Sequence, residues 1–194
     1  MPSAYLNGGW VALEDAKVSV LDRGFLFGDS VYEVIPVYNG KLFCLDRHLA
    51  RLEQSLAEVL MDNPMTRQGW SELLQEAVAK SGDLFASLYL QVSRGADTAR
   101  SFVYPAEVTQ TVFVMVNPDQ NLERKTVQPL NVVTLEDFRW DRGHIKTTSL
   151  IAAGILKNQA IAKGGDDALL IKSGYLTEST SANVFVVIDG AVIT

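Results

Sequence analysis

Apolar and polar residues alternate along several short stretches of the chain, and this alternation predicts β-strands with one buried face. The clearest case is VYEVIPVY, residues 31–38, which ends at an Asn-Gly dipeptide typical of hairpin turns. A second hairpin is predicted in NVFVVIDGAVIT, residues 183–194, where an Asp-Gly dipeptide closes the turn. Further strands are predicted at residues 4–13, 84–93, 109–117 and 131–140.

Three longer stretches carry apolar residues at helical spacing. In LDRHLARLEQSLAEVL, residues 45–60, leucines recur every three or four positions, which predicts an amphipathic helix. Residues 66–82 follow a similar pattern and end in a glycine. Residues 148–165 predict a third helix, which a Gly-Gly pair ends. Strands and helices mixed in this order indicate an α+β protein.

A polar stretch divides the chain into two parts. Residues 117–130, NPDQNLERKTVQPL, are rich in proline, asparagine and charge, which is typical of a linker. We therefore predict a small N-terminal domain at residues 1–116 and the start of a larger domain at residues 131–194. The last predicted strand runs to Thr194, so we expect the second domain to be truncated, with its remainder missing.

The overall composition narrows the classes of partner. The 194 residues are 47% hydrophobic, enough for a sizeable core, and carry a net charge of −6. Acidic and basic residues are interspersed without a basic run, which argues against nucleic acid and anionic membranes as partners. Cys44 is the single cysteine, so no internal disulfide is expected, and this fits a reducing compartment.

The N-terminal stretch and the hydropathy pattern predict a cytoplasmic protein. No basic segment followed by an apolar one, the pattern of a signal peptide, occurs at the start of the sequence. No apolar run approaches the roughly 20 residues of a membrane span. With two histidines and one cysteine, the sequence predicts no metal site.

Lys146 stands between an apolar residue and two threonines, just before the third predicted helix. On the sequence alone it is either a solvated lysine or an imine-forming nucleophile held in a cleft. A cation here faces the positive end of the helix dipole, which is unusual for a purely structural lysine. Glu178 is either an exposed turn residue or a ligand of a pyridine nitrogen, and Arg51 is either a solvated helix residue or a phosphate ligand.

Five motifs occur in order along the chain. They are DRGFLFGDSVYEV, HLARL, RGADTAR, RWDRGHIKTTSL and LTESTSANVF. The series resembles the fold-type IV class of pyridoxal-phosphate enzymes, which contains D-amino acid aminotransferases, branched-chain aminotransferases and aminodeoxychorismate lyases. The resemblance implies that Lys146 is the Schiff-base lysine, that Glu178 binds the pyridine nitrogen of pyridoxal 5'-phosphate and that Arg51 binds its phosphate.

Within this class the chain is most similar to the D-amino acid aminotransferases. The segment GDSVYEVIPVYNG is similar to theirs, and the stretch after Lys146 lacks the tyrosine typical of branched-chain enzymes. The glycine-rich R-G-x-G-G-R-G loop of the lyases is absent from the sequence. The resemblance implies a two-domain α+β fold, in which a small α/β domain precedes the first part of a larger β-rich domain.

The same resemblance gives expectations for the substrate pocket. Tyr32 and a loop arginine, which maps to Arg100, are expected to bind the substrate carboxylate. Arg94 is the second candidate for binding the substrate carboxylate, or else it has a structural role. Either arginine could alternatively be a charged residue on the surface of the loop. Tyr32 could alternatively be an aromatic residue that only packs within the sheet. His48 resembles a histidine that lies behind Tyr32 in this group. Phe102 stands where that group has a histidine.

The activity implied is transamination of D-alanine with 2-oxoglutarate to pyruvate and D-glutamate, with ping-pong kinetics. A homodimer is implied as well, because in this class the loop that contains Arg100 reaches the neighbouring subunit's site. An aminodeoxychorismate lyase, which removes pyruvate, is the alternative, since this loop departs from the expected pattern. A member without activity is the third hypothesis, and the retained Lys146, Glu178 and Arg51 argue against it.

Overall fold

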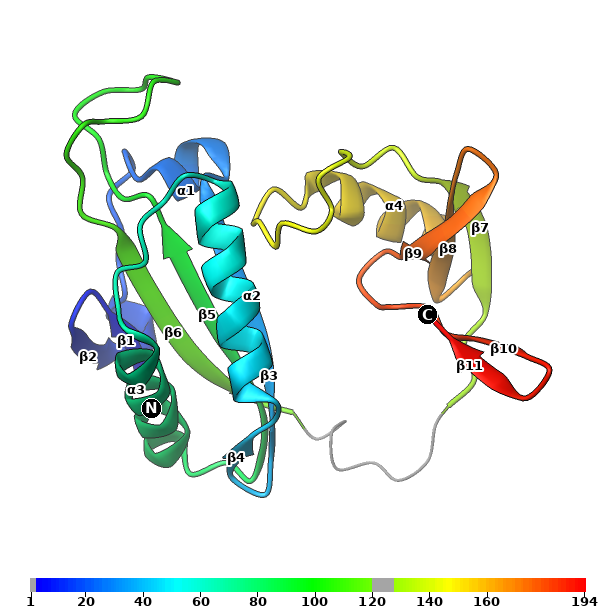
Figure 1. The fold of residues 1–194 in the computed structure, drawn as a ribbon, viewed down its shortest axis with the longest axis horizontal. Helices are drawn as coiled ribbons and strands as arrows, with labels where there is room; N and C mark the ends of the chain where they lie inside the picture. Colours follow the sequence, from blue (N-terminus) through cyan, green and yellow to red (C-terminus); the bar gives the residue numbers. More distant parts are fainter. Residues whose placement is uncertain (1–2, 120–127) are drawn as a thin grey trace. The chain divides into compact units, whose positions relative to one another are not determined.

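The computed structural model describes residues 3–119 and 128–194 of the chain. The chain folds into two compact units, which can be followed in Figure 1. Unit 1 comprises Met1–Lys125 and His144–Ser149, and unit 2 comprises Thr126–Gly143 and Leu150–Thr194. Each unit combines helices with strands, which confirms the predicted α+β class.

Unit 1 is built on a six-stranded antiparallel sheet with the strand order β2-β1-β6-β5-β3-β4. The long strands β3 (Ser30–Tyr38) and β5 (Phe85–Ser93) pair along their whole length. The remaining strands are β1 (Ser3–Leu6), β2 (Gly9–Ala12), β4 (Lys41–Leu42) and β6 (Thr111–Pro118). The strands predicted around residues 31–38, 84–93 and 109–117 are thereby confirmed.

Two helices, α2 (Leu45–Glu58) and α3 (Arg67–Ser81), cover one face of this sheet, as Figure 1 shows. Two short elements, η1 (Leu13–Asp15) and α1 (Arg23–Phe27), precede β3. Burial of a large apolar side chain contributes about 1.5–3 kcal/mol, so the layer between helices and sheet is the main apolar support of unit 1. Its fully buried members include Val31, Ile35, Leu49, Leu52, Leu56, Trp70, Leu74, Leu88 and Leu90.

Strand β3 has two distinct faces because successive side chains point to opposite sides of a sheet. Val31, Glu33 and Ile35 are fully buried on the face that carries the helices. Tyr32 is half-buried and Val34 is exposed, and both belong to the opposite face. One strand therefore presents a tyrosine to one side and a carboxylate to the other.

Residues 144–149 form an additional short pairing along β3. Strand β4 covers only Val37 and Tyr38, which leaves the first half of that edge of β3 open. Thr147 pairs there with Val31 in antiparallel fashion. Residues 144–149 fall within the second domain predicted from the sequence, at residues 131–194, whereas the structure groups them with unit 1 because of these backbone contacts.

The predicted linker at residues 117–130 is only partly described. Strand β6 continues to Pro118, which lies opposite Ala86 of β5, so the first two residues of the predicted linker belong to the sheet. Residues 120–127 lie outside the described residues. The first strand of unit 2 begins at Val132.

Unit 2 contains a three-stranded sheet with the order β7-β8-β9. Strands β7 (Val132–Glu136) and β8 (Asp167–Lys172) are parallel, and helix α4 (Ile151–Ala162) lies between them in the sequence. Strand β9 (Tyr175–Ser179) returns antiparallel to β8. The helix packs on this sheet through a small apolar core of Leu135, Leu156, Ala160, Ala168 and Leu170.

The last two strands, β10 (Val186–Ile188) and β11 (Ala191–Ile193), form the hairpin predicted from the sequence. Asp189 and Gly190 connect them with φ angles of +49° and +78°. Positive φ at both central residues is what a type I′ turn requires, and Asp-Gly is among the pairs that adopt it readily. The predicted turn is therefore confirmed.

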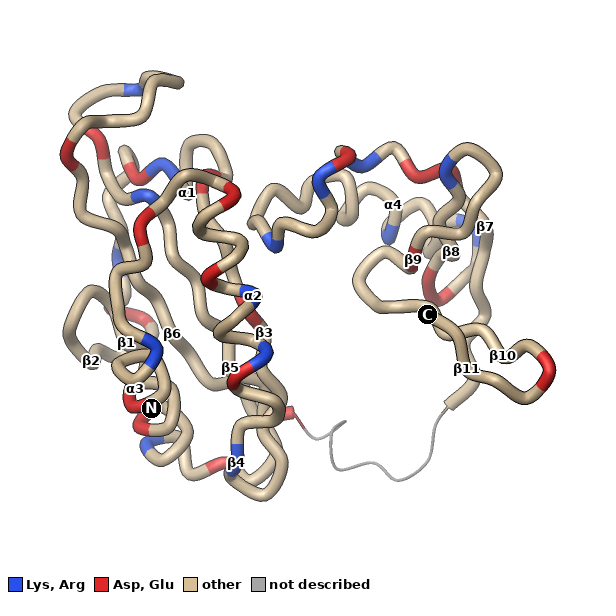
Figure 2. Tube along the Cα trace, in the orientation of Figure 1, with Lys and Arg blue, Asp and Glu red and all other residues tan. Residues whose placement is uncertain are grey.

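Basic and acidic residues occur along the chain in both units, as the blue and red segments of the trace in Figure 2 show. Within the described residues, no helix is long and apolar enough to cross a bilayer. Nor does the described part of the chain bring together three or more histidine, cysteine, aspartate or glutamate residues that could hold a metal ion. Many of the charged side chains in the described residues form ion pairs or small hydrogen-bonded networks.

Candidate active site

Lys146 lies in the segment that pairs with β3, and its backbone is held from two sides. Its carbonyl oxygen accepts a hydrogen bond of 2.9 Å from the backbone N–H of Tyr32. Its own N–H donates to the hydroxyl oxygen of Ser55 on α2 at 3.3 Å. The hydroxyls of Ser30 and Thr148, 2.5 Å apart, tie the same segment to the start of β3. Strand and helix together fix the position of the lysine.

The amine of Lys146 lies over the ring of Tyr32, with Nζ 4.1 Å from the ring centroid. The lysine is half-buried, and no carboxylate among the described residues is paired with its Nζ. The Tyr32 ring also stacks on Tyr89 at a centroid distance of 5.7 Å. This environment differs from that of a solvated surface lysine, because the side chain is placed on an aromatic face and its nitrogen is not neutralised nearby.

Glu33 is fully buried beneath β3 and accepts hydrogen bonds from two residues of α2. Arg51 donates from Nε to Oε1 at 2.7 Å and from Nη2 to Oε2 at 2.6 Å. The Nδ1 atom of His48 hydrogen-bonds Oε2 at 2.8 Å. Burial alone would raise the pKa of Glu33, but the hydrogen bonds from Arg51 and His48 outweigh it and leave that pKa below its usual value.

Arg51 uses Nε and Nη2 to bind Glu33, which leaves its third guanidinium nitrogen, Nη1, available. Among the described residues, no group accepts a hydrogen bond from Nη1, and the side chain is 47% exposed. Arg51 lies one helical turn from Ser55, the residue that binds the backbone of Lys146, so both lie on one face of α2. The structure thus places Arg51 close to the segment that holds Lys146, and places His48 against Glu33.

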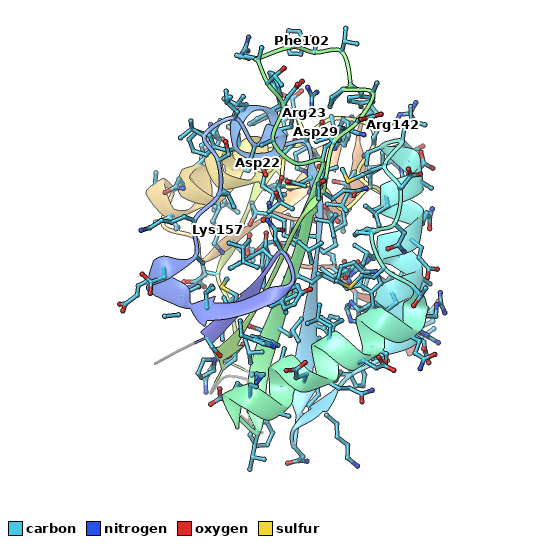
Figure 3. The ribbon with its side chains drawn as sticks, turned by 90° about the vertical axis from the view of Figure 1, so that its left-hand side faces the viewer. Asp22, Arg23, Asp29, Phe102, Arg142 and Lys157 are labelled. Carbon is cyan, nitrogen blue, oxygen red and sulfur yellow. The ribbon has the colours of Figure 1, made fainter. Side chains whose placement is uncertain are left out.

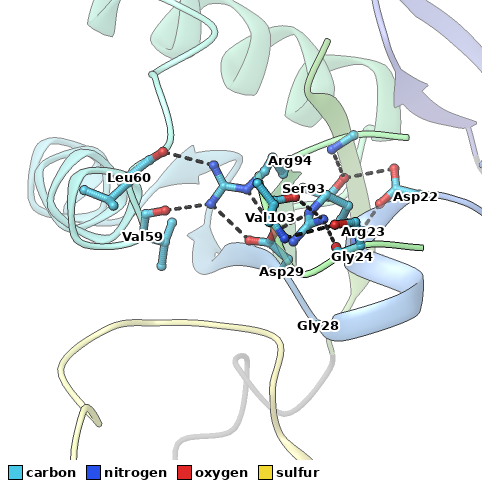
Figure 4. A network of polar contacts seen from close by, with 12 residues as sticks. Asp22, Arg23, Gly24, Gly28, Asp29, Val59, Leu60, Ser93, Arg94 and Val103 are labelled. Atoms are coloured by element: carbon cyan, nitrogen blue, oxygen red, sulfur yellow. Dashed lines mark hydrogen bonds and ion pairs between the residues drawn. The ribbon is translucent and has the colours of Figure 1, made fainter. Parts of the chain in front are cut away.

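Arg94 lies in a buried polar network at the base of the loop that follows β5, shown in Figure 4. It donates twice to Asp29, at 2.8 and 3.2 Å, and once each to the carbonyls of Val59 and Leu60. Its guanidinium also lies 3.6 Å from the ring centroid of Tyr104, and only 5% of the residue is exposed. These contacts agree with the structural alternative for Arg94, because most of its donors are already used.

Arg100 lies farther along the same loop and is exposed. Its guanidinium is 5.0 Å from the ring of Phe27 and 5.4 Å from that of Phe102. Phe102 is 78% exposed, and Figure 3 shows it at the outer end of the loop, away from Arg23 and Asp29. The loop therefore presents a cation and an aromatic ring that unit 1 does not bury.

Gly95 fixes the point where this loop leaves the sheet. Its φ is +97°, and a Cβ atom there would lie 2.0 Å from the carbonyl oxygen of Thr109. Only glycine fits such a close approach with this backbone conformation. The two ends of the loop are consequently held together at its base.

Glu178 lies on β9 in unit 2 and contacts one cation. Arg139 donates from Nη1 to Oε1 of Glu178. The other edge of Arg139 is paired with Asp137, to which it donates from Nε at 2.9 Å and from Nη2 at 2.7 Å. Glu178 is 44% exposed, and its Oε2 accepts no hydrogen bond from the described residues.

The sequence model of the amino-transferase class IV family matches residues 30–194 of the chain. The chain belongs to this family. Among similar class IV proteins, the D-alanine aminotransferase of Bacillus licheniformis is 37% identical over 97% of this chain and 66% of its own length. That of Staphylococcus epidermidis is 32% identical over 100% of this chain and 69% of its own length. The chain thus spans about two thirds of the length of these relatives.

Solved structures of class IV proteins share the fold of this chain. A T.th. branched-chain amino acid aminotransferase with pyridoxamine 5'-phosphate has a TM-score of 0.87 at 25% identity, over 98% of this chain and 66% of that one. A putative 4-amino-4-deoxychorismate lyase of Legionella pneumophila has a TM-score of 0.80 at 22% identity, over 93% of this chain and 66% of that one. The fold alone therefore does not separate a transaminase from a lyase.

No role was assigned from the sequence to two charged residues, Glu33 of unit 1 and Arg139 of unit 2, that contact candidate residues in the structure. In VYEVIPVY, period-two alternation places Glu33 on the same face as Val31 and Ile35. The sequence pattern could therefore have predicted a carboxylate on the buried face of this strand. Arg139 stands in the motif RWDRGHIKTTSL, but its partner Glu178 is 39 residues away and no periodicity links the two. Pairings of that kind become visible only in the folded chain.

We expect this class IV protein to lose stability in acid through Asp137. Hydrogen bonds from Arg139 hold the pKa of Asp137 far below its usual value. A lowered folded-state pKa gives stability that is present above the unfolded pKa of about 3.9 and is lost as the pH falls toward the folded value. Below pH 4, urea unfolding should show the wild type losing up to about 1.4 kcal/mol per pH unit more than Asp137→Asn. Parallel curves for the two proteins would contradict this assignment.

Proposed function

We propose that the protein is a pyridoxal-phosphate-dependent aminotransferase that exchanges the amino group of D-alanine with 2-oxoglutarate. The observation that carries the proposal is the placement of Lys146, whose backbone is fixed by β3 and α2 and whose amine lies on Tyr32 without a carboxylate partner among the described residues. The similarity to D-alanine aminotransferases supports the substrate, and membership of the class IV family supports the reaction type.

The donor groups in the two units fit the cofactor chemically. The amine of Lys146 suits an aldehyde, the open Nη1 of Arg51 suits a phosphate, and the carboxylate of Glu178 suits a protonated pyridine nitrogen. The T.th. relative was solved with pyridoxamine 5'-phosphate, which agrees with this donor set. When bound, pyridoxal phosphate supplies an electron-withdrawing ring that stabilises negative charge at the substrate's α-carbon.

Lys146 is the residue proposed to move the proton. As a general base, its amine takes the proton from the α-carbon of the amino acid and carries it during the exchange. The Tyr32 ring and the hydrogen bonds to Tyr32 and Ser55 restrict where that nitrogen can lie. A fixed base gains its rate advantage from position, because a small displacement from the reacting atom is costly.

Arg51 and Glu33 are proposed to bind and orient rather than to transfer protons. The bidentate pair with buried Glu33 fixes the plane of the Arg51 guanidinium and turns Nη1 outward. A planar, pre-oriented guanidinium loses little conformational freedom when it binds a phosphate. His48 completes the support by contacting the second oxygen of Glu33.

Tyr32 and Arg100 are the proposed ligands of the substrate carboxylate. Arg100 is exposed on the loop after β5 and has no carboxylate partner among the described residues, so its charge remains available. We infer a homodimer in which this loop serves the neighbouring copy, which agrees with the exposure of Phe102 and Val103 at its end. Sedimentation velocity of the purified protein would show a monomer if that inference is wrong.

The test is a half-reaction with defined amino acids. The protein is loaded with pyridoxal phosphate, and loss of the cofactor's visible band is followed after addition of D-alanine, with L-alanine as the control. We expect a response to D-alanine, release of one pyruvate per site, and recovery of the band with 2-oxoglutarate. A loaded protein that ignores both alanines but releases pyruvate from aminodeoxychorismate would overturn the transaminase proposal in favour of the lyase.

A further inference from the structure

We propose that Arg139 is a positioning residue that holds the Glu178 carboxylate in place, so that its Oε2 stays available to the ring nitrogen of the cofactor. The inference deepens the proposed function and rests on the role given there to Glu178. It is drawn from contacts within unit 2, where a chain of four side chains runs from Thr177 through Asp137 and Arg139 to Glu178. No step of the proposed reaction uses Arg139 directly.

The first link fixes Arg139 itself. Asp137 accepts from Nε and Nη2 of Arg139, so two parallel hydrogen bonds set the plane of the guanidinium. Oδ1 of Asp137 also accepts from the backbone N–H of Arg139 at 3.1 Å. The Asp137 side chain is 5% exposed, and its backbone N–H donates to the carbonyl of Ile171 at 2.8 Å. An arginine held in this way cannot follow a moving partner.

The second link transfers this rigidity to Glu178. With one edge of the guanidinium used by Asp137, Nη1 is the nitrogen that contacts Oε1 of Glu178. The neighbouring Thr177 donates its hydroxyl to Asp137 Oδ2 at 2.8 Å and lies 3.1 Å from the carbonyl of Leu170. Thr177 and Glu178, two successive residues of β9, thus both hydrogen-bond to the Asp137–Arg139 pair. Oε2 of Glu178 is left as the oxygen available to a ligand.

The charges around the pair explain why a cation is needed there. Arg139 stands between two carboxylates, Asp137 and Glu178, and its hydrogen bonds to them raise its pKa above the usual value. The other charged groups described close by are Lys172 and Asp141, which pair with each other; Lys172 also donates to the backbone carbonyl of Arg139. Without the Arg139 charge, no cation would separate the carboxylates of Glu178 and Asp137, and their repulsion would turn the Glu178 side chain away.

Glu178 can bind a protonated ring nitrogen only as an anion in a defined place. A displaced Glu178 carboxylate would not remove the amine of Lys146 or the guanidinium of Arg51, which are proposed to bind other groups of the cofactor. The loss should therefore be graded rather than complete. Outer-shell partners at metal sites change affinity or activity about 10- to 100-fold when removed, which sets the expected scale.

The experiment compares Arg139→Gln with wild type and with Arg47→Gln, which removes an exposed arginine of α2 from outside the site. The carbon-13 signal of the Glu178 carboxyl, assigned with Glu178→Gln, is measured at pH 7 without cofactor. Dissociation of pyridoxal phosphate and kcat and KM for D-alanine are measured separately. We expect Arg139→Gln to shift the Glu178 signal, to weaken cofactor binding about tenfold or more, and to leave KM nearly unchanged.

The outcomes separate this inference from the proposed function. A folded Arg139→Gln protein with the wild-type Glu178 signal and cofactor affinity overturns the role of Arg139 while the transaminase stands. A wild type that binds no pyridoxal phosphate overturns the proposed function and, with it, the ring-nitrogen role. If Arg139→Gln does not fold, Arg139→Lys decides: the ammonium keeps the charge but cannot span both carboxylates, so a loss of affinity supports the proposal and wild-type affinity overturns it.

Discussion

Replacement of Lys146 by alanine is expected to lower the rate of the proposed D-alanine transamination on the order of 10⁴-fold, the upper range for losing a positioned general base. The reason lies in its surroundings: the Lys146 amine rests on Tyr32, and no neighbouring lysine shares the segment that pairs with β3. Pyruvate formation in a coupled assay with saturating pyridoxal phosphate measures the effect. Circular dichroism establishes that the variant is folded.

Lys163→Ala is the matched control for that variant. Lys163 is exposed at the C-terminal end of α4, so its removal changes the net charge by the same amount without touching the proposed site. We expect it to retain the wild-type rate. If Lys146→Ala kept more than a tenth of the wild-type rate, another group would have to serve as the base and the proposed mechanism would fail.

Replacement of Asp29 by alanine is expected to destabilise the protein by about 3–5 kcal/mol, the usual cost of leaving a buried charge without its partner. Asp29 lies between Arg23 and Arg94, and accepts a hydrogen bond of 2.8 Å from Nε of each. The side chains of the two arginines are only 3% and 6% exposed, so water cannot replace the lost carboxylate easily. Denaturation by guanidinium chloride, monitored by tryptophan fluorescence, measures the change.

The control for Asp29 is an aspartate without such burial. Asp15 lies exposed in η1, and Asp15→Ala should change the free energy of unfolding by less than about 0.5 kcal/mol. Equal effects of the two substitutions would mean that the network in Figure 4 does not stabilise the fold as described. The comparison also bears on the loop, because Arg23 donates to the carbonyl of Ser101.

Local patterns were enough to predict much of the fold. Hairpin turns depend on two residues, and Asn39 and Asp189 both adopt the positive φ that their Asn-Gly and Asp-Gly contexts indicate. The leucine spacing of α2 likewise predicted which face is buried. The short helix α1 was missed, because its five residues are too few to show a period and its start depends on Asp22 accepting from the Gly24 N–H.

The geometry of the candidate site could not be predicted from the sequence, because it depends on contacts between residues far apart in the chain. The motifs pointed to Lys146 as a candidate, but they gave no reason to expect that its segment pairs with β3 and hydrogen-bonds Ser55, 91 residues earlier. A sequence pattern reports which side of an element is buried, not which distant element covers it. For the same reason, the two loop arginines looked alike in sequence, although Arg94 is buried in an ion-pair network and Arg100 is exposed.

The two-sided character of β3 limits how this stretch of the gene can change. Tyr32 points to one face of the strand and Glu33 to the other. Because successive residues of a strand alternate between the two faces, each side chain depends on its exact position in the strand. A one-residue insertion or deletion just before Tyr32 would exchange the two faces, sending the tyrosine into the helix layer and the carboxylate out of it. Substitutions can accumulate here, but changes of length cannot. A protein engineer seeking new substrates should therefore vary residue identity along β3 and reserve insertions for the loop that contains Arg100.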